Sequence, residues 1–163
     1  MTPVAAHLAA GIEGPGGTRR LAERLASALI AGDVVCLYGQ MGAGKTTFAR
    51  CLASSLGYAG EVVSPTFKLM NVYAGDLTVY HFDLYRIGSA DELTSIGLDE
   101  YLNGGEGADA GICLVEWPEV AEAYLPAARV VVGIGAAGRP DHRVVRISSG
   151  DAGAASRLAE AGL

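Results

Sequence analysis

Residues 39–46 form a complete phosphate-binding pattern, Gly-x-x-x-x-Gly-Lys-Thr. The apolar run 34–38 precedes this pattern and predicts a buried strand, while apolar residues recur at helical spacing after it, from Phe48 to Leu56. Strand, glycine loop and helix in this order let backbone N–H groups converge on phosphate oxygens at the N-terminus of a helix. The sequence therefore predicts that the chain binds a nucleoside triphosphate.

The candidate nucleotide-binding residues are those of the loop and the residue that follows it: Gly39, Gln40, Met41, Gly42, Ala43, Gly44, Lys45, Thr46 and Thr47. In this pattern the lysine reaches the β- and γ-phosphates, and the hydroxyl of the next residue binds Mg²⁺. We therefore expect Lys45 to hold phosphate and Thr46 to be a metal ligand.

The length and composition predict one domain over residues 1–163, large enough for a substantial core. No apolar stretch approaches the ~18 residues of a membrane span, and the first residues lack the layout of a secretion signal. Cys36, Cys51 and Cys113 lie in apolar patterns rather than at metal-ligand spacing. We expect them to be buried thiols in a reducing compartment, which predicts a cytoplasmic protein with no membrane contact.

The charge distribution argues against autonomous nucleic-acid binding, which normally needs a basic face. The formal net charge is −6, and residues 87–128 contain nine acidic residues and no Lys or Arg. Such a run is either a solvated face or a docking surface for a basic partner, and the sequence leaves both open. If nucleic acid is involved, another protein is expected to hold it.

The remaining pattern predicts an α/β fold of the P-loop NTPase type, with a mostly parallel central sheet, antiparallel hairpin additions and helices on both faces. Thr18 is expected to cap the first helix, which ends near Gly32. Further helices are predicted after the phosphate loop, ending at Gly57, and over residues 90–102. The alanine-rich tail from residue 151 has a weak helical pattern. The run 103–111 is expected to be a glycine-rich loop. Predicted strands cover 34–38, 68–73, 78–85, 112–116, 129–134 and 143–147.

Two acidic residues compete for the metal site and for orienting water. Glu116 follows four apolar residues, where a carboxylate is expected to emerge at the carboxyl edge of the sheet. Asp83 lies on a predicted strand whose alternation turns one polar face outward and the other face into the core. The first face carries His81, Asp83 and Tyr85, and the second carries Tyr80, Phe82 and Leu84. We predict both acids at the magnesium site, but their division of roles does not follow from spacing.

Thr66 follows Ser64 and Pro65 at a position where nucleotidases often keep a switch-like loop. It is a candidate sensor of the γ-phosphate or metal, although an ordinary extended entry into a strand fits the spacing equally well. Trp117, beside Glu116, is expected in the core or as a cap.

Five segments together resemble the TsaE family (formerly YjeE), the small bacterial ATPases required for threonylcarbamoyladenosine in tRNA. They are Gly-Gln-Met-Gly-Ala-Gly-Lys-Thr-Thr-Phe at 39–48, Ser-Pro-Thr-Phe at 64–67, Asn-Val-Tyr at 71–73, His-Phe-Asp-Leu-Tyr-Arg at 81–86 and Glu-Trp-Pro-Glu at 116–119. The resemblance extends from about Ala28 to Pro126.

The resemblance implies that ATP and Mg²⁺ are the cofactors and that the chain hydrolyses ATP. We expect hydrolysis by the isolated chain to be slow, because positioning and charge stabilisation would depend on its complex with partners. It implies that TsaD and TsaB are the partners, that these carry out the transfer to tRNA, and that the ATPase supports their repeated turnover. By position it assigns Thr66, Asp83 and Glu116 to the catalytic environment. Gln40, Met41, Cys51 and Lys68 depart from residues common in the family, and none of these departures removes a phosphate or metal ligand.

Two other functions remain compatible with the phosphate loop. A small-molecule or nucleoside kinase usually closes an arginine-bearing lid over the phosphates, and the absence of Arg and Lys from 87–128 counts against it. A nucleotide switch or scaffold without hydrolysis would not need Glu116.

Overall fold

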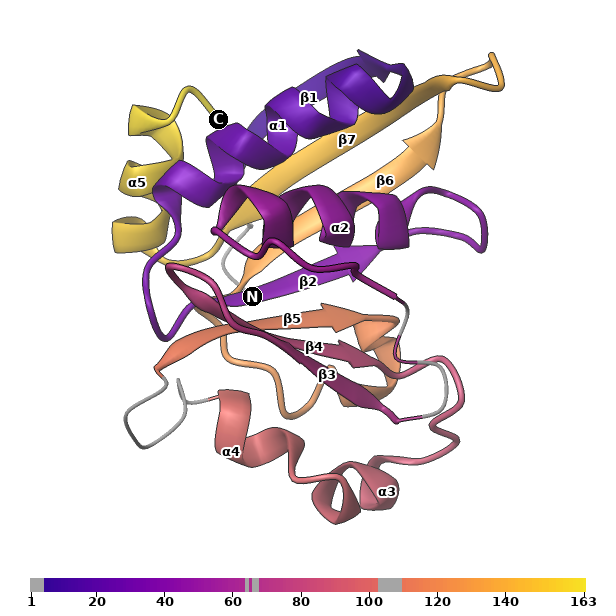
Figure 1. The fold of residues 1–163 in the computed structure, drawn as a ribbon, viewed down its shortest axis with the longest axis vertical. Helices are drawn as coiled ribbons and strands as arrows, with labels where there is room; N and C mark the ends of the chain where they lie inside the picture. The colour runs from indigo at the N-terminus through magenta and orange to yellow at the C-terminus, as the bar shows by residue number, and fades with distance from the viewer. Residues whose placement is uncertain (1–4, 64, 66–67, 103–109) are drawn as a thin grey trace.

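The computed structural model describes residues 5–63, 65, 68–102 and 110–163, and in these residues the chain folds around one sheet of seven strands (Figure 1). The strand order is β1-β7-β6-β2-β5-β4-β3. The bounds are β1 (Ala5–Glu13), β2 (Val34–Tyr38), β3 (Met70–Tyr73), β4 (Thr78–Asp83), β5 (Gly111–Glu116), β6 (Val130–Ala136) and β7 (His142–Ser149). Strands β6, β2, β5 and β4 run parallel, whereas β7, β1 and β3 are antiparallel additions. This arrangement confirms the predicted α/β class.

Helices cover both faces of this sheet, because alternate residues of the buried strands point to opposite sides. Val35 and Leu37 pack against α1, α2 and α5, while Val34 and Cys36 face α3, α4 and a 3₁₀ helix, η1. The bounds are α1 (Gly14–Ala28), α2 (Lys45–Ser55), α3 (Ala90–Ser95), α4 (Leu98–Leu102), η1 (Pro118–Ala121) and α5 (Ala152–Glu160). In the part of the chain that the structure describes, no helix is long and apolar enough to cross a membrane.

The register of the parallel strands brings the candidate site residues to one edge of the sheet. β2 ends where the phosphate loop begins, and Leu37 near its end is paired with Glu116 at the end of β5. Asp83, the last residue of β4, is paired with Glu116 on the other side. Because parallel strands end at the same edge, the two predicted acids lie next to each other and beside the loop.

The N-terminal region differs from the prediction. Residues 5–13 form β1, which the sequence did not predict, and α1 begins at Gly14 rather than behind Thr18. The Thr18 hydroxyl donates to the Gly14 carbonyl 3.4 Å away, so Thr18 lies inside the helix and does not cap it. Pro15 lies in the first turn of α1, where a proline is well accommodated, so the helix can begin before Thr18.

The segment predicted as one helix over 90–102 is instead two short helices. Gly97 separates them with φ +70, in the left-handed region that glycine readily adopts. Thr66 and residues 103–109, predicted as part of a switch-like loop and of a glycine-rich loop, lie outside the described residues.

Two of the three cysteines are buried as predicted, since Cys36 and Cys113 lie in strands whose two faces are covered. Cys51, on α2, is half-buried, and all three thiols are free.

Candidate nucleotide-binding site

The phosphate loop connects β2 to α2 and has room for an anion above it. Gly42 and Gly44 have φ angles of +77 and +108, which side-chain-bearing residues rarely adopt. No heavy atom of the described chain lies within 4 Å of a Cβ built on either glycine, so their backbone faces open space. Gly44 is the residue before α2 and has no side chain to cap the helix. The first-turn N–H groups therefore remain available for phosphate oxygens.

Gly39 serves a different purpose, because it allows the loop to pack against β6. A Cβ at this position would lie 2.7 Å from the Ile134 carbonyl oxygen and 3.1 Å from the Ala43 Cβ. From β7, the Arg143 guanidinium donates through Nε to the Ala43 carbonyl, 3.0 Å away. Strands β6 and β7 thus hold the loop from behind.

Lys45 is folded back onto its own loop. Its ammonium donates to the carbonyl oxygens of Gly39 at 2.5 Å and Gln40 at 3.0 Å. The same nitrogen lies 3.9 Å from the centre of the Trp117 ring. The residue is only 5% exposed. Burial lowers the pKa of the Lys45 ammonium, and the carboxylates of Glu116, Glu119 and Asp83 oppose that shift. An anion bound in the loop would restore the electrostatic stabilisation of the buried ammonium.

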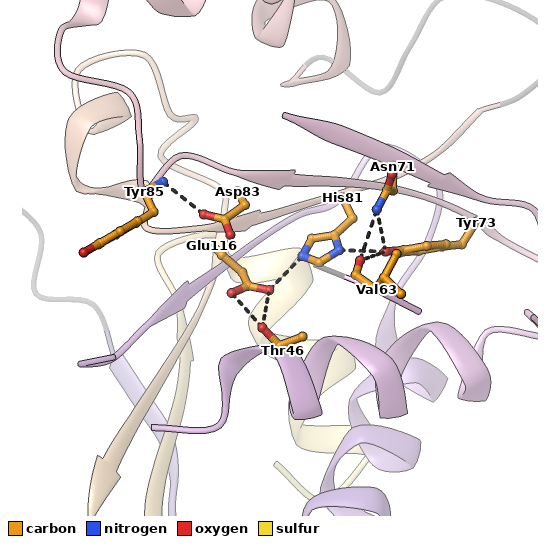
Figure 2. A network of polar contacts seen from close by, with 8 residues as sticks. All are labelled: Thr46, Val63, Asn71, Tyr73, His81, Asp83, Tyr85 and Glu116. Atoms are coloured by element: carbon orange, nitrogen blue, oxygen red, sulfur yellow. Dashed lines mark hydrogen bonds and ion pairs between the residues drawn. The ribbon is translucent and has the colours of Figure 1, made fainter. Parts of the chain in front are cut away.

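Glu116 is a buried carboxylate directed at the start of α2. It is 2% exposed, and both of its carboxylate oxygens lie 3.4 Å from the Thr46 hydroxyl (Figure 2). Its Oε1 is also 2.9 Å from Nε2 of His81. Asp83 lies beside Glu116, is half-exposed, and accepts a hydrogen bond from the Tyr85 backbone N–H at 3.0 Å. The structure therefore brings Thr46, Asp83 and Glu116 together, as the sequence analysis expected.

The loop and the acids share one cavity of about 340 Å³. Its lining residues are Met41, Gly42, Gly44, Lys45, Thr46, Thr47, Asp83, Tyr85, Glu116 and Trp117. A second hollow of about 760 Å³ lies on the other side of the loop, against the turn between β6 and β7. Gly39, Gln40 and Ala43 line this second hollow together with Arg139 and Arg143. The phosphate loop thus forms the boundary between two open spaces.

These residues fit a magnesium nucleotide. A hydroxyl and two carboxylates supply the hard oxygen ligands that Mg²⁺ takes in proteins. The open glycine backbone, the uncapped helix start and a buried ammonium supply the donors and charge that phosphates require.

Comparisons with known proteins show which family the chain resembles. Residues 12–144 match the family model described as "Threonylcarbamoyl adenosine biosynthesis protein TsaE". The tRNA threonylcarbamoyladenosine biosynthesis protein TsaE of Bacillus subtilis (strain 168) is 39% identical over 138 residues, which cover 84% of this chain and 83% of that protein. Its counterpart in Treponema pallidum (strain Nichols) is 42% identical over 103 residues, or 63% of this chain and 73% of that protein.

The chain belongs to the TsaE family. Its fold superposes on the crystal structure of YdiB from Bacillus subtilis with a TM-score of 0.83, at 32% sequence identity and over 99% of this chain and 97% of that one. The region matched by the TsaE family model includes the phosphate loop, Asp83 and Glu116.

Two cavity residues of this TsaE-family chain were not predicted from its sequence. Trp117, expected in the core or as a cap, is half-buried, and its ring faces Lys45. Tyr85 lies against the same ring, with the two ring centres 4.9 Å apart. Trp117 directly follows Glu116, and Tyr85 is two residues after Asp83. Both residues lie just beyond the ends of two parallel strands, and this position is the sequence signal that could have placed them at the cavity.

His81 corrects another expectation. The sequence analysis placed His81 on the polar face of this strand, opposite the face that points into the core, but the His81 side chain is completely buried. β4 lies between β3 and β5, and helices cover this face of the sheet, so no solvent reaches the imidazole.

Proposed function

We propose that this chain is a Mg²⁺-dependent ATP hydrolase that supports the formation of threonylcarbamoyladenosine in tRNA by acting on a TsaD–TsaB transferase complex. Membership of the TsaE family supports the pathway, because the relatives are named for threonylcarbamoyladenosine biosynthesis. The site geometry supports the nucleotide chemistry.

One observation carries the proposal. Three features line a single cavity. They are the buried Lys45, the start of α2 after Gly44, which provides no side-chain cap, and the buried Glu116 carboxylate beside Thr46. Burying both Lys45 and Glu116 is costly unless their charges are used or paired. A bound triphosphate would supply a negative counter-charge for Lys45, and its metal would supply a positive one for Glu116.

Each residue then has a definite task. On binding, Lys45 would leave the carbonyls of Gly39 and Gln40 for the β- and γ-phosphate oxygens. Thr46, with Glu116 and Asp83, would hold Mg²⁺, which neutralises the charge that develops on the phosphates. Asp83 is half-buried and lines the cavity, and there it would orient the attacking water. The nucleoside would extend over the loop into the second hollow beside β6 and β7.

The charge of the chain supports an indirect role for tRNA. With a net charge of −6 and no Lys or Arg in 87–128, the chain has little means of holding a polyanion itself. We expect the transferase partners to bind tRNA, and the hydrolysis of ATP to reset their complex between turnovers.

The deciding experiment measures multiple-turnover threonylcarbamoylation of tRNA by the cognate TsaD and TsaB, with wild-type chain or Lys45→Ala. Stimulation by the wild type alone would support the proposal, provided that thermal melting shows the variant to be folded. Lack of stimulation by either protein would overturn the pathway assignment. Stimulation without ATP consumption would overturn hydrolysis and favour a nucleotide switch, and phosphate transfer to a small acceptor would favour a kinase.

A further inference from the structure

A network of hydrogen-bonded polar groups lies in the protein interior next to Glu116. His81 is completely buried, with Nε2 2.9 Å from Oε1 of Glu116 and Nδ1 3.1 Å from the Tyr73 hydroxyl (Figure 2). The Tyr73 hydroxyl is 2.9 Å from the Val63 carbonyl oxygen, which Asn71 also contacts at 3.1 Å through its side-chain amide. Side chains on β3, β4 and β5 are thereby linked to Thr46 on α2.

A Glu116 that binds Mg²⁺ is ionised and can only accept hydrogen bonds, and two proton arrangements of His81 and Tyr73 are compatible with that state. If the Tyr73 hydroxyl donates to Nδ1, the proton of a neutral imidazole lies on Nε2 and points at Glu116. If Tyr73 instead donates to the Val63 carbonyl, Nδ1–H donates to the Tyr73 oxygen and a protonated Nε2–H again points at the carboxylate. His81 is therefore a hydrogen-bond donor to an ionised Glu116 in either case.

Among the contacts that the described residues make with the Glu116 carboxylate, the one from His81 is the shortest. The bond to His81 is 2.9 Å long, whereas the Thr46 hydroxyl is 3.4 Å from each carboxylate oxygen. The carboxylate is buried, so loss of the imidazole would leave Oε1 with a weaker set of hydrogen bonds and free the side chain to rotate. A histidine packed only for its volume would not need both ring nitrogens aligned on polar partners.

We propose that His81 is a positioning residue that orients Glu116 toward Thr46 and the magnesium position, and that Tyr73 fixes the imidazole for this task. The inference rests on the proposed function, because it assigns Glu116 to Mg²⁺. His81 is not among the described residues that line the cavity, so it would act through the carboxylate that it contacts.

The test compares three substitutions by calorimetric titration with the slowly hydrolysed ATP analogue AMP-PNP, with and without Mg²⁺. In His81→Gln the side-chain amide reaches the position of Nε2, whereas in His81→Asn the shorter amide reaches only that of Nδ1. His81→Phe removes both polar atoms. Mg²⁺ is expected to increase the nucleotide affinity of the wild-type protein. We expect this increase to be about tenfold smaller in His81→Asn and His81→Phe, as is typical when a residue that hydrogen-bonds to a metal ligand is replaced. We expect His81→Gln to retain most of the increase caused by Mg²⁺. In all three variants, the affinity for the nucleotide without metal should stay within about twofold of the wild-type value.

Two further variants separate positioning from stability. Phe82→Leu changes an equally buried residue on the opposite face of β4, so it should lower the melting temperature without altering the Mg²⁺ dependence. Tyr73→Phe removes the hydroxyl behind the imidazole and should lose a smaller part of the Mg²⁺ dependence than His81→Phe.

The outcomes are distinct. Wild-type Mg²⁺ dependence in His81→Phe, or equal losses in the Gln and Asn variants, would overturn the positioning role. If the wild-type protein binds the magnesium nucleotide but hydrolyses no ATP, only the proposed ATPase activity is contradicted. The titrations then still test the positioning role of His81. Wild-type binding that is indifferent to Mg²⁺ would overturn both.

Discussion

The Thr46 hydroxyl lies 3.4 Å from both carboxylate oxygens of Glu116, although 70 positions separate these residues in the chain. The contact joins the first turn of α2 to the last residue of β5. A metal held by Thr46 would therefore be within reach of Glu116, while Asp83 occupies the neighbouring strand end. This geometry suggests a division between the two acids that spacing left open.

The first prediction concerns that division. Glu116→Gln keeps the shape of the side chain but removes its charge, so we expect at least a tenfold higher Mg²⁺ requirement and an about 100-fold lower rate of ATP hydrolysis. Asp83→Asn should lower the rate while changing the Mg²⁺ requirement less than about threefold, because Asp83 is half-buried at the neighbouring strand end, whereas Glu116 is buried and contacts Thr46. Phosphate release measured over a Mg²⁺ titration tests both.

The control for this pair is nucleotide binding in the absence of metal, which should be retained in both variants. An Asp83→Asn protein with the larger shift in Mg²⁺ requirement would reverse the assignment of the two acids.

The sequence predicted the parts of this site that depend on local pattern. Strand, glycine loop and helix follow from residues 34–56, and the apolar run before Glu116 is sufficient to place that carboxylate at a sheet edge. The parallel register then brings the ends of β4 and β5 together, so the proximity of Asp83 and Glu116 follows once the topology is known.

Other features depend on tertiary packing, which no local pattern reveals. The alternation along β4 separated the two faces correctly, but it could not show that the face of His81 is covered as well. The Trp117 ring faces Lys45 because its backbone is left-handed, with φ 55, which is rare for a residue with a side chain. β1 was missed because its pairing with β7 joins the two ends of the sequence.

The second prediction concerns the close packing of the loop. Gly39→Ala would place a methyl group 2.7 Å from the Ile134 carbonyl oxygen, so the loop must move. We expect nucleotide affinity to fall at least about tenfold and the melting temperature to drop. Gly133→Ala is the matched control, because a Cβ there meets no heavy atom of the described chain within 4 Å and its stability should change by less than about 0.5 kcal/mol. Equal effects of the two substitutions would show that the contact with β6 is unimportant.

The third prediction uses the single tryptophan of the chain. Trp117 lies 3.9 Å from the Lys45 ammonium, which must move to reach phosphate. Titration with nucleotide should therefore produce a saturable change in intrinsic fluorescence, with a midpoint that agrees with calorimetry. Lys45→Met should show neither binding nor the fluorescence change. Binding detected by calorimetry without any optical change would mean that the lysine and the ring stay together.

The last prediction is a pH dependence of stability that arises from a buried thiol. Burial raises the pKa of Cys36 from 9.0 to about 12, which keeps the thiol neutral in the folded protein. In the unfolded chain it ionises above pH 9, so its contribution is complete below pH 9 and is lost as the pH rises towards 12, by about 1.4 kcal/mol per pH unit. Cys36→Val removes this titration and keeps an apolar side chain. Urea unfolding at pH 8 and pH 10 should show wild type losing about 1 kcal/mol more than the variant, and an equal loss in both would contradict the shift.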